Sequence, residues 1–262
     1  MGPSGSGKST LLHCLSGMDR PDAGSVLLGG TDITSLNEKE LAALRLTRFG
    51  FVFQQAHLMT TLCLLDNIVL PGFLAGLRPR SEVTSRGEEL MERMGIADLA
   101  ASGVTEVSGG QLQRAGICRA LINDPGIVFA DEPTGALNSA TALQILDLLG
   151  EIHASGTTLV MVTHDTQVAA RADRVLVLVD GRIMEDLSWA GTRRSRGPRA
   201  WRRSPRPSSA AACDGAGSVA SAAAAAAARG GRGDVAQAQQ VAGLVPGGDA
   251  LRCPRPQRGR HR

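Results

Sequence analysis

The sequence begins with a glycine-rich loop that runs directly into a helix. Residues 2–9, Gly2-Pro3-Ser4-Gly5-Ser6-Gly7-Lys8-Ser9, fit the pattern G-x-x-x-x-G-K-[ST] at every fixed position. Glycines let such a loop curl until successive main-chain N–H groups point inward, and the following helix adds the positive end of its dipole. A flexible Gly/Ser leader is the alternative, but Thr10-Leu11-Leu12 is a good helix start with an apolar face. The loop therefore predicts a site for nucleotide phosphates, in which Lys8 bridges the β- and γ-phosphates and the Ser9 hydroxyl ligates Mg²⁺.

Short apolar segments alternate with helical segments along residues 8–189. We expect strands at Ser25–Leu28, Phe49–Phe53, Ile127–Ala130 and Thr157–Val162, helices at Lys8–Met18, Asn37–Leu46 and Ala140–Ala154, and a hairpin in which Arg174–Val179 turns at Asp180-Gly181 into Arg182–Met184. The stretch from about Asp66 to Ala101 is expected to be mostly helical, with interruptions at Pro71 and at the polar link Arg78–Ser85. This alternation predicts an α/β fold with a mostly parallel sheet.

Two of the expected strands end in groups that can act on a phosphate. Asp131 and Glu132 follow the apolar strand that starts at Ile127, so Asp131 would hold the Mg²⁺ hydration shell and Glu132 would face the attacking water as general base. His164 follows a second apolar strand and could sense or orient the γ-phosphate. A strand followed by an acidic turn, or a solvated histidine at a strand end, is the plainer alternative for each signal taken alone.

A third phosphate-binding signal lies between the other two. In Val107-Ser108-Gly109-Gly110-Gln111-Leu112-Gln113-Arg114, a Ser-Gly-Gly run precedes a helix and offers a second set of N–H groups. This stretch, about 17 residues before the acidic strand end, resembles the signature of the ATPase subunits of ABC transporters. Gln54, after Phe49-Gly50-Phe51-Val52-Phe53, matches that family's Q-loop, and Gly135-Ala136-Leu137-Asn138 matches its D-loop. The resemblance covers roughly residues 2–187, and details such as Asp131-Glu132-Pro133-Thr134-Gly135 favour the subgroup that serves lipoprotein-releasing and macrolide-export permeases.

The resemblance implies a P-loop NTPase fold of the RecA-like kind, with an inserted helical subdomain at about residues 61–120 that docks on a transmembrane permease. It also implies a homodimer in which each ATP lies between the phosphate loop of one subunit and the signature of the other. The residues implied to bind ATP are Gly2, Pro3, Ser4, Gly5, Ser6, Gly7, Lys8, Ser9 and Thr10 in cis, and Ser108, Gly109, Gly110 and Gln111 in trans. Glu132, His164 and Gln54 are the implied catalytic residues, and Ser9, Gln54 and Asp131 the implied Mg²⁺ ligands. Such a subunit works in the cytoplasm, at the inner face of the cell membrane.

The C-terminal part of the chain has a different composition. Residues 1–189 carry 14 Lys and Arg against 22 Asp and Glu, whereas residues 190–262 carry 14 Arg against 3 Asp, together with a seven-alanine run at 222–228. Few core-forming side chains occur there, so we expect one nucleotide-binding domain at 1–189 and a disordered segment at 190–262. Five scattered cysteines, Cys14, Cys63, Cys118, Cys213 and Cys253, fit free thiols in a reducing compartment.

Three features depart from the family pattern. Asn138 stands where the D-loop usually has Asp, the Arg-rich end is atypical, and no strand or adenine-stacking aromatic precedes the phosphate loop. We therefore expect the 262-residue chain to have little ATPase activity of its own, and a truncated and frameshifted product is one alternative. A nucleic-acid-associated ABC ATPase with a basic anchor is the other. We do not expect nucleic acid as a partner, because the basic segment lacks interleaved aromatics for base stacking.

Overall fold

The computed structural model describes residues 1–189 and 201–203, which divide into two compact units. Residues 1–35, 164–189 and 201–203 belong to the first unit, and residues 36–163 form the second. Apart from 201–203, the segment 190–262 lies outside the described residues, so its expected disorder and the expected domain boundary stay predictions. In the described residues, no helix is long and apolar enough to cross a membrane.

The first unit contains the phosphate loop and an antiparallel ribbon. Its elements are α1 (Lys8–Leu15), β1 (Leu27–Leu28), β2 (Thr31–Asp32), the 3-10 turn Ile33–Ser35, α7 (Thr166–Ala169), β6 (Arg174–Val179), β7 (Arg182–Trp189) and β8 (Trp201–Arg203). The expected hairpin is present, because β6 pairs antiparallel with β7, which is longer than expected and pairs in turn with β8. The turn at Asp180-Gly181 has positive φ at both residues, 48° and 74°, as a tight hairpin turn requires.

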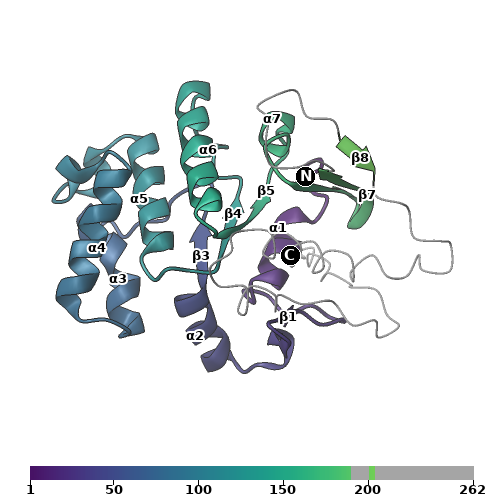
Figure 1. Cartoon of the computed structure of the whole chain (residues 1–262), viewed down its shortest axis with the longest axis horizontal. Coiled ribbons are helices and arrows are strands. Elements are labelled where there is room, and N and C mark those ends of the chain that lie inside the picture. Colours follow the sequence, from purple (N-terminus) through teal and green to yellow (C-terminus); the bar gives the residue numbers. More distant parts are fainter. Residues whose placement is uncertain (190–200, 204–262) are drawn as a thin grey trace, which may run out of the picture. The chain divides into compact units, whose positions relative to one another are not determined.

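The second unit packs helices around a parallel sheet. Its elements are α2 (Glu38–Arg48), β3 (Phe49–Val52), α3 (Leu64–Ala75), α4 (Arg80–Arg93), the 3-10 turns Ala97–Leu99 and Val104–Glu106, α5 (Gly109–Leu121), β4 (Ile127–Asp131), α6 (Ser139–Ala154) and β5 (Thr158–Val162). The strands β3, β4 and β5 lie side by side in that order (Figure 1) and are parallel. The prediction of an α/β fold with a parallel sheet is confirmed for this unit.

The register of the sheet decides which loops meet. Val52 pairs with Ala130, and Asp131 pairs with Val162. The carboxyl ends of all three strands therefore reach one edge, where ligands bind in open parallel sheets. The rings of Phe49 and Phe51 on β3 and of Phe129 on β4 pack against one another, with the Phe49 and Phe129 ring centroids 5.1 Å apart.

One expectation about the helical stretch was wrong, and another was right only in part. Pro71 does not interrupt the stretch but lies inside α3. The expected interruption at Arg78–Ser85 is present but shorter and earlier, at residues 76–79, because α4 already begins at Arg80. A proline inside a helix removes one main-chain hydrogen bond. The helix continues because Leu64, Ile68 and Val69 are almost completely buried in the core of this unit, so that packing overrides local propensity.

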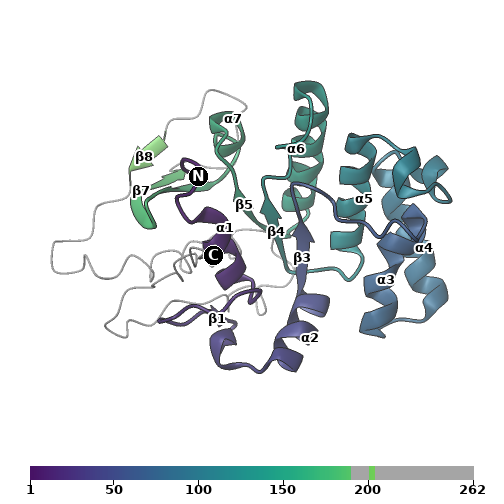
Figure 2. The same cartoon turned by 180° about the vertical axis from the view of Figure 1, so that it is seen from behind.

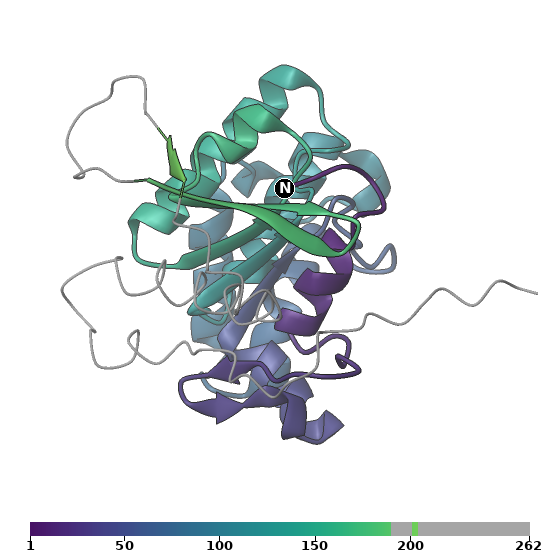
Figure 3. The same cartoon turned by 90° about the vertical axis from the view of Figure 1, so that its right-hand side faces the viewer.

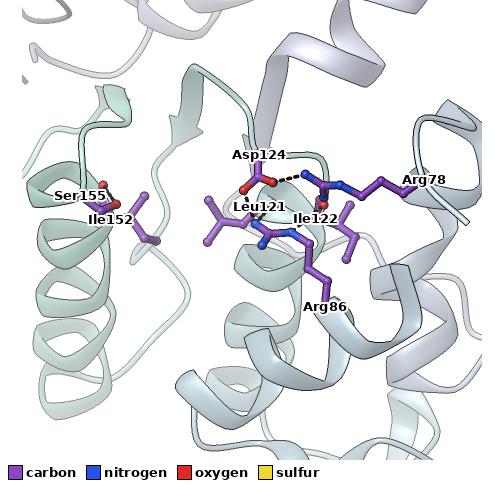
Figure 4. Close-up of polar contacts among 7 residues, drawn as sticks. All are labelled: Arg78, Arg86, Leu121, Ile122, Asp124, Ile152 and Ser155. Carbon is purple, nitrogen blue, oxygen red and sulfur yellow. Dashed lines mark hydrogen bonds and ion pairs between the residues drawn. The ribbon is translucent and has the colours of Figure 1, made fainter. Parts of the chain in front are cut away.

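Helices α3, α4 and α5 pack against one another (Figure 2), and an arginine of α4 secures the end of α5. Arg86 donates from Nε to the Ile122 carbonyl at 3.0 Å and from Nη2 to the Leu121 carbonyl at 3.2 Å. Its guanidinium also pairs with Asp124, which accepts from Arg78 as well (Figure 4). Carbonyls at a helix C-terminus have no partner within the helix, so this contact stabilises the end of α5.

Candidate functional site

Glycine conformations give the phosphate loop its shape. Gly5 and Gly7 have φ values of 80° and 87°, in the left-handed region that other residues adopt only with strain. Gly7 is also the N-cap of α1, so the loop runs into the helix without a break. The side chain of Lys8 is buried, and its Nζ donates to the Pro3 carbonyl at 2.8 Å. The Lys8 ammonium is thus held against the loop in which it is expected to meet a phosphate.

The loop is fastened to the β6–β7 ribbon at both of its ends. The Leu178 N–H donates to the Met1 carbonyl at 2.8 Å, and the Gly181 N–H donates to the Ser6 carbonyl at 3.1 Å. Figure 3 shows the first residues beside this ribbon. An added Cβ at Gly2 would lie 2.0 Å from the Leu178 carbonyl oxygen, so only glycine fits the close approach of the loop to β6.

Among the described residues of the first unit, one buried polar side chain has no hydrogen-bond partner. The Ser6 hydroxyl is buried and makes no hydrogen bond. Every other buried side-chain nitrogen or oxygen in the described residues has a hydrogen-bond partner. The Met1 ammonium donates to the Leu176 carbonyl at 2.6 Å, and burial, followed by repulsion from Lys8, lowers its pKa. The loop therefore combines a buried lysine, inward curvature and a helix N-terminus, which together fit the phosphates of ATP.

The acidic strand end lies in the second unit, at the carboxyl edge of its sheet. Asp131 is the last residue of β4, and the Glu132 N–H donates to the Val162 carbonyl of β5 at 3.0 Å. Glu132 has a φ of 45°, a left-handed conformation that costs a non-glycine residue about 1–3 kcal/mol. The neighbouring strand thus holds the main chain of Glu132 in a conformation that the residue does not prefer by itself.

The Gln54 and Glu132 side chains converge on Gly135. An added Cβ at Gly135 would lie 2.9 Å from Gln54 Nε2 and 3.3 Å from Glu132 Oε2. Gln54 follows the end of β3 by two residues and Glu132 follows β4 directly, so the parallel register brings the two side chains to one edge. The sequence indicated Gly135 only as part of the stretch that matches the D-loop, and not as the residue on which Gln54 and Glu132 converge.

The signature segment forms the N-terminus of α5. The Ser108 hydroxyl accepts from the Gln111 N–H at 3.4 Å, while the Ser108 N–H donates to Gln111 Oε1 at 2.8 Å, which is a capping box. Ser108 and Gly109 are exposed, and an added Cβ at Gly110 would lie 2.6 Å from Thr141 Cγ2. Gly110 thus lets the start of α5 approach α6 closely, while Ser108 and Gly109 stay exposed.

The substituted D-loop residue has a structural task of its own. Asn138 is the N-cap of α6, because its side-chain oxygen accepts from the Thr141 N–H at 3.0 Å. Aspartate and asparagine cap helices about equally well. The replacement of Asp by Asn at this position is therefore compatible with the local fold.

The candidate residues are divided between the two units. The phosphate loop and the exposed His164 belong to the first unit, whereas Gln54, Asp131, Glu132 and the signature belong to the second. In the second unit the structure brings Gln54, Glu132 and Gly135 together. Sequence reasoning missed Gln113 and Arg119 of α5, which bind the main chain after β3. A polar residue at position 113 in an otherwise buried helix face was the available signal.

The oxygen donors suit magnesium by their chemistry. A serine hydroxyl, a glutamine amide and an aspartate carboxylate are hard ligands, of the kind Mg²⁺ takes together with substrate phosphates and water. Within residues 1–189, no group of three or more His, Cys, Asp and Glu side chains could hold a metal by itself.

Comparisons with known proteins point in one direction. Residues 1–135 match the model of the ABC transporter family. The chain is 46% identical over 186 residues to a macrolide export ATP-binding/permease protein MacB of Rhodospirillum rubrum, and 47% identical over 186 residues to that of Rhodopseudomonas palustris. Each alignment covers 71% of this chain but only 28% of the relative, so the chain spans less than a third of the length of these proteins.

Solved structures agree with the sequence comparison. The chain is similar, with a TM-score of 0.68 and 38% identity, to a dimeric ATP-binding cassette in a post-hydrolysis state bound to ADP and inorganic phosphate. It has the same TM-score and identity to a dimeric bacterial ABC transporter cassette, and each match covers 73% of this chain and 84% of the other. The P-loop NTPase fold expected from the sequence is confirmed. The chain belongs to the ABC transporter family and carries that family's ATPase cassette.

Proposed function

We propose that this chain binds and hydrolyses ATP as the cassette of a transporter of the macrolide-export or lipoprotein-release type. In this proposal two cassettes dimerise at the inner face of the membrane, and their closure over ATP drives a transmembrane permease. The observation that carries it is the convergence of Gln54 and Glu132 on Gly135 at the carboxyl edge of the sheet. The names of the similar proteins and the dimeric state of the similar cassettes support the type of transporter and the dimer.

The chemistry is divided among residues of both units. The phosphate loop binds the β- and γ-phosphates through its main chain, and Lys8 compensates their charge. Glu132 accepts a proton from the attacking water, and its strained main chain fixes the direction of the carboxylate. Ser9, Gln54 and Asp131 would hold Mg²⁺, which would supply charge compensation at the phosphates. His164 contacts the γ-phosphate from beyond the end of β5.

The signature completes the second face of the nucleotide. Ser108, Gly109, Gly110 and Gln111 are exposed or half-buried at the start of α5. The main-chain N–H groups of Gly109 and Gly110 and the α5 dipole favour a negatively charged group that approaches from outside the subunit. A mixed dimer, with Glu132→Gln in one subunit and Ser108→Ala in the other, is predicted to retain one intact site, because both substitutions then fall on the same nucleotide.

The first test of the proposal is ATP binding. Lys8→Ala removes the buried ammonium, and the lost charge-assisted contact is expected to weaken ATP binding by about 1.5–3 kcal/mol, roughly 10- to 100-fold. Calorimetric titration of the full chain with Mg-ATP measures the effect. Lys39→Ala, which changes an exposed lysine of α2, is the matched control and should bind like the parent. Equal affinity in all three proteins would remove Lys8 from the site.

A further inference from the structure

Side chains on one face of α5 hydrogen-bond to the main chain of the segment that follows β3. Gln113 is almost completely buried, and its Nε2 donates to the Phe53 carbonyl at 2.9 Å. That carbonyl belongs to the peptide bond that joins Phe53 to Gln54. Gln113 therefore holds the main chain immediately before the residue that converges with Glu132.

A second set of hydrogen bonds lies nearly two turns further along the same helix. Arg119 donates from Nη2 to the Ala56 carbonyl at 2.5 Å and from Nη1 to the His57 carbonyl at 2.9 Å. His57 has a φ of 46°, a conformation that persists only where its surroundings fix it. Burial of the Arg119 guanidinium lowers its pKa.

Close packing brings the helix and the segment into direct contact between these two residues. Gly116 lies three residues from both Gln113 and Arg119, on the same face of α5. An added Cβ at Gly116 would lie 3.2 Å from the Ala56 Cβ, so the segment rests directly on the helix. Helix α3 holds the far end, where the buried Asn67 accepts from the Met59 N–H at 2.7 Å and donates to the Met59 carbonyl at 3.0 Å.

We propose that Gln113 and Arg119 are positioning residues. They fix the segment that contains Gln54 on α5, the helix that begins with the signature, so that the segment and the helix move together. This inference rests on the proposed function for the roles of Gln54 and Ser108. Because both anchors are carbonyls of the segment itself, a displacement of Gln54 on nucleotide binding is transmitted to α5 without a change in the contacts of either side chain.

Amide hydrogen exchange of the full chain without nucleotide tests whether the hydrogen bonds of Gln113 and Arg119 fix this segment. Gln113→Met and Arg119→Met remove the donors while keeping apolar bulk, and the amides of residues 54–59 should then exchange about tenfold faster or more. Arg114→Met is the matched control, since Arg114 is also on α5 but donates to the Met94 carbonyl and to Gln144. Arg119→Lys, which keeps the charge but loses the fork of donors, should give an intermediate rate.

Unchanged exchange at residues 54–59 in the folded Gln113 and Arg119 variants, or equal acceleration in Arg114→Met, would overturn the proposal. Thermal unfolding of each variant separates a local release from a general loss of structure. If Arg119→Met does not fold, the comparison between Arg119→Lys and Arg114→Met decides. This measurement needs no nucleotide, so its outcome is independent of whether the chain hydrolyses ATP.

A double-mutant cycle tests the link to catalysis. If Arg119 acts through Gln54, Arg119→Met should lower kcat/KM for Mg-ATP about tenfold in the parent but less than about twofold in a Gln54→Ala background. The effect of Arg114→Met should be the same in both backgrounds. Additive effects of Arg119→Met and Gln54→Ala would overturn the positioning role. Absence of ATP binding in the parent would instead contradict the proposed function. The exchange result would still test whether Gln113 and Arg119 hold residues 54–59 on α5.

Discussion

At the scale of single residues, the site depends on a position without a side chain. Gly135 has ordinary negative φ, so its main chain does not require glycine. What requires glycine is space, because the Gln54 amide and the Glu132 carboxylate both lie within van der Waals contact of the place where a Cβ would stand. The residue thus allows the amide and the carboxylate to approach each other.

Gly135→Ala is therefore expected to displace Gln54 or Glu132 and to lower the rate of ATP hydrolysis about tenfold, with little effect on the melting temperature. Gly150→Ala is the control, since a Cβ there meets nothing within 4 Å and alanine favours a helix such as α6. Phosphate release and thermal unfolding of both variants check this. A rate for Gly135→Ala equal to that of the parent would mean that the convergence on Gly135 has no part in hydrolysis.

The described cysteines differ in how they should respond to alkylation. Burial raises the pKa of the Cys118 thiol to about 12, and Cys118 lies in the core, whereas Cys63 is only partly buried. Iodoacetamide at pH 8 should therefore modify Cys63 in the folded chain and Cys118 only after denaturation, as peptide mass spectrometry can show. Because the Cys118 pKa is higher in the folded chain than its ordinary 9.0, this thiol stabilises the fold fully below pH 9 and loses that effect as the pH rises toward 12. Equal labelling of both thiols in the folded chain would show that the core opens readily.

At the scale of elements, helix ends matter more than helix interiors. Asn138 caps α6 directly after the loop that carries Gly135. Asn138→Ala should destabilise the chain by about 1 kcal/mol, whereas Asn138→Asp should change the free energy of unfolding by less than about 0.5 kcal/mol. Urea unfolding of the three proteins measures both effects. An equal loss in Asn138→Asp would indicate that the amide makes a contact that a carboxylate cannot replace.

The elements also show what could be predicted from the sequence. Strands β3, β4 and β5 were predictable because each is a short apolar run that ends in a polar group, and parallel order follows from the helices between them. Pro71 was misread because local propensity outweighs packing in any sequence-based argument, while in the molecule the buried face of α3 decides. The grip of Gln113 and Arg119 joins residues about 60 apart in the chain, so no local pattern reports it.

At the scale of the whole molecule, membership of the ABC transporter family is one question and the ATPase activity of this 262-residue chain is another. The match to ABC transporter cassettes covers the part of the chain that carries the ordered motifs, and the relatives extend well beyond it. The expectations that residues 190–262 are disordered and that the 262-residue chain has low ATPase activity stay predictions. A ratio between two variants of one chain, rather than an absolute rate, is therefore the appropriate test of the mechanism.

The most direct measurement is phosphate release from Mg-ATP by the full chain and by Glu132→Gln, with ATP affinity determined for both by calorimetry. The amide keeps the shape of the side chain but cannot take a proton from water, so turnover should fall about 100-fold or more while ATP binding is retained. Glu151→Gln, on the exposed face of α6, is the control and should match the parent. Retained ATP binding together with equal turnover in the parent and Glu132→Gln would contradict the central claim that Glu132 is the base of an ATP-hydrolysing cassette.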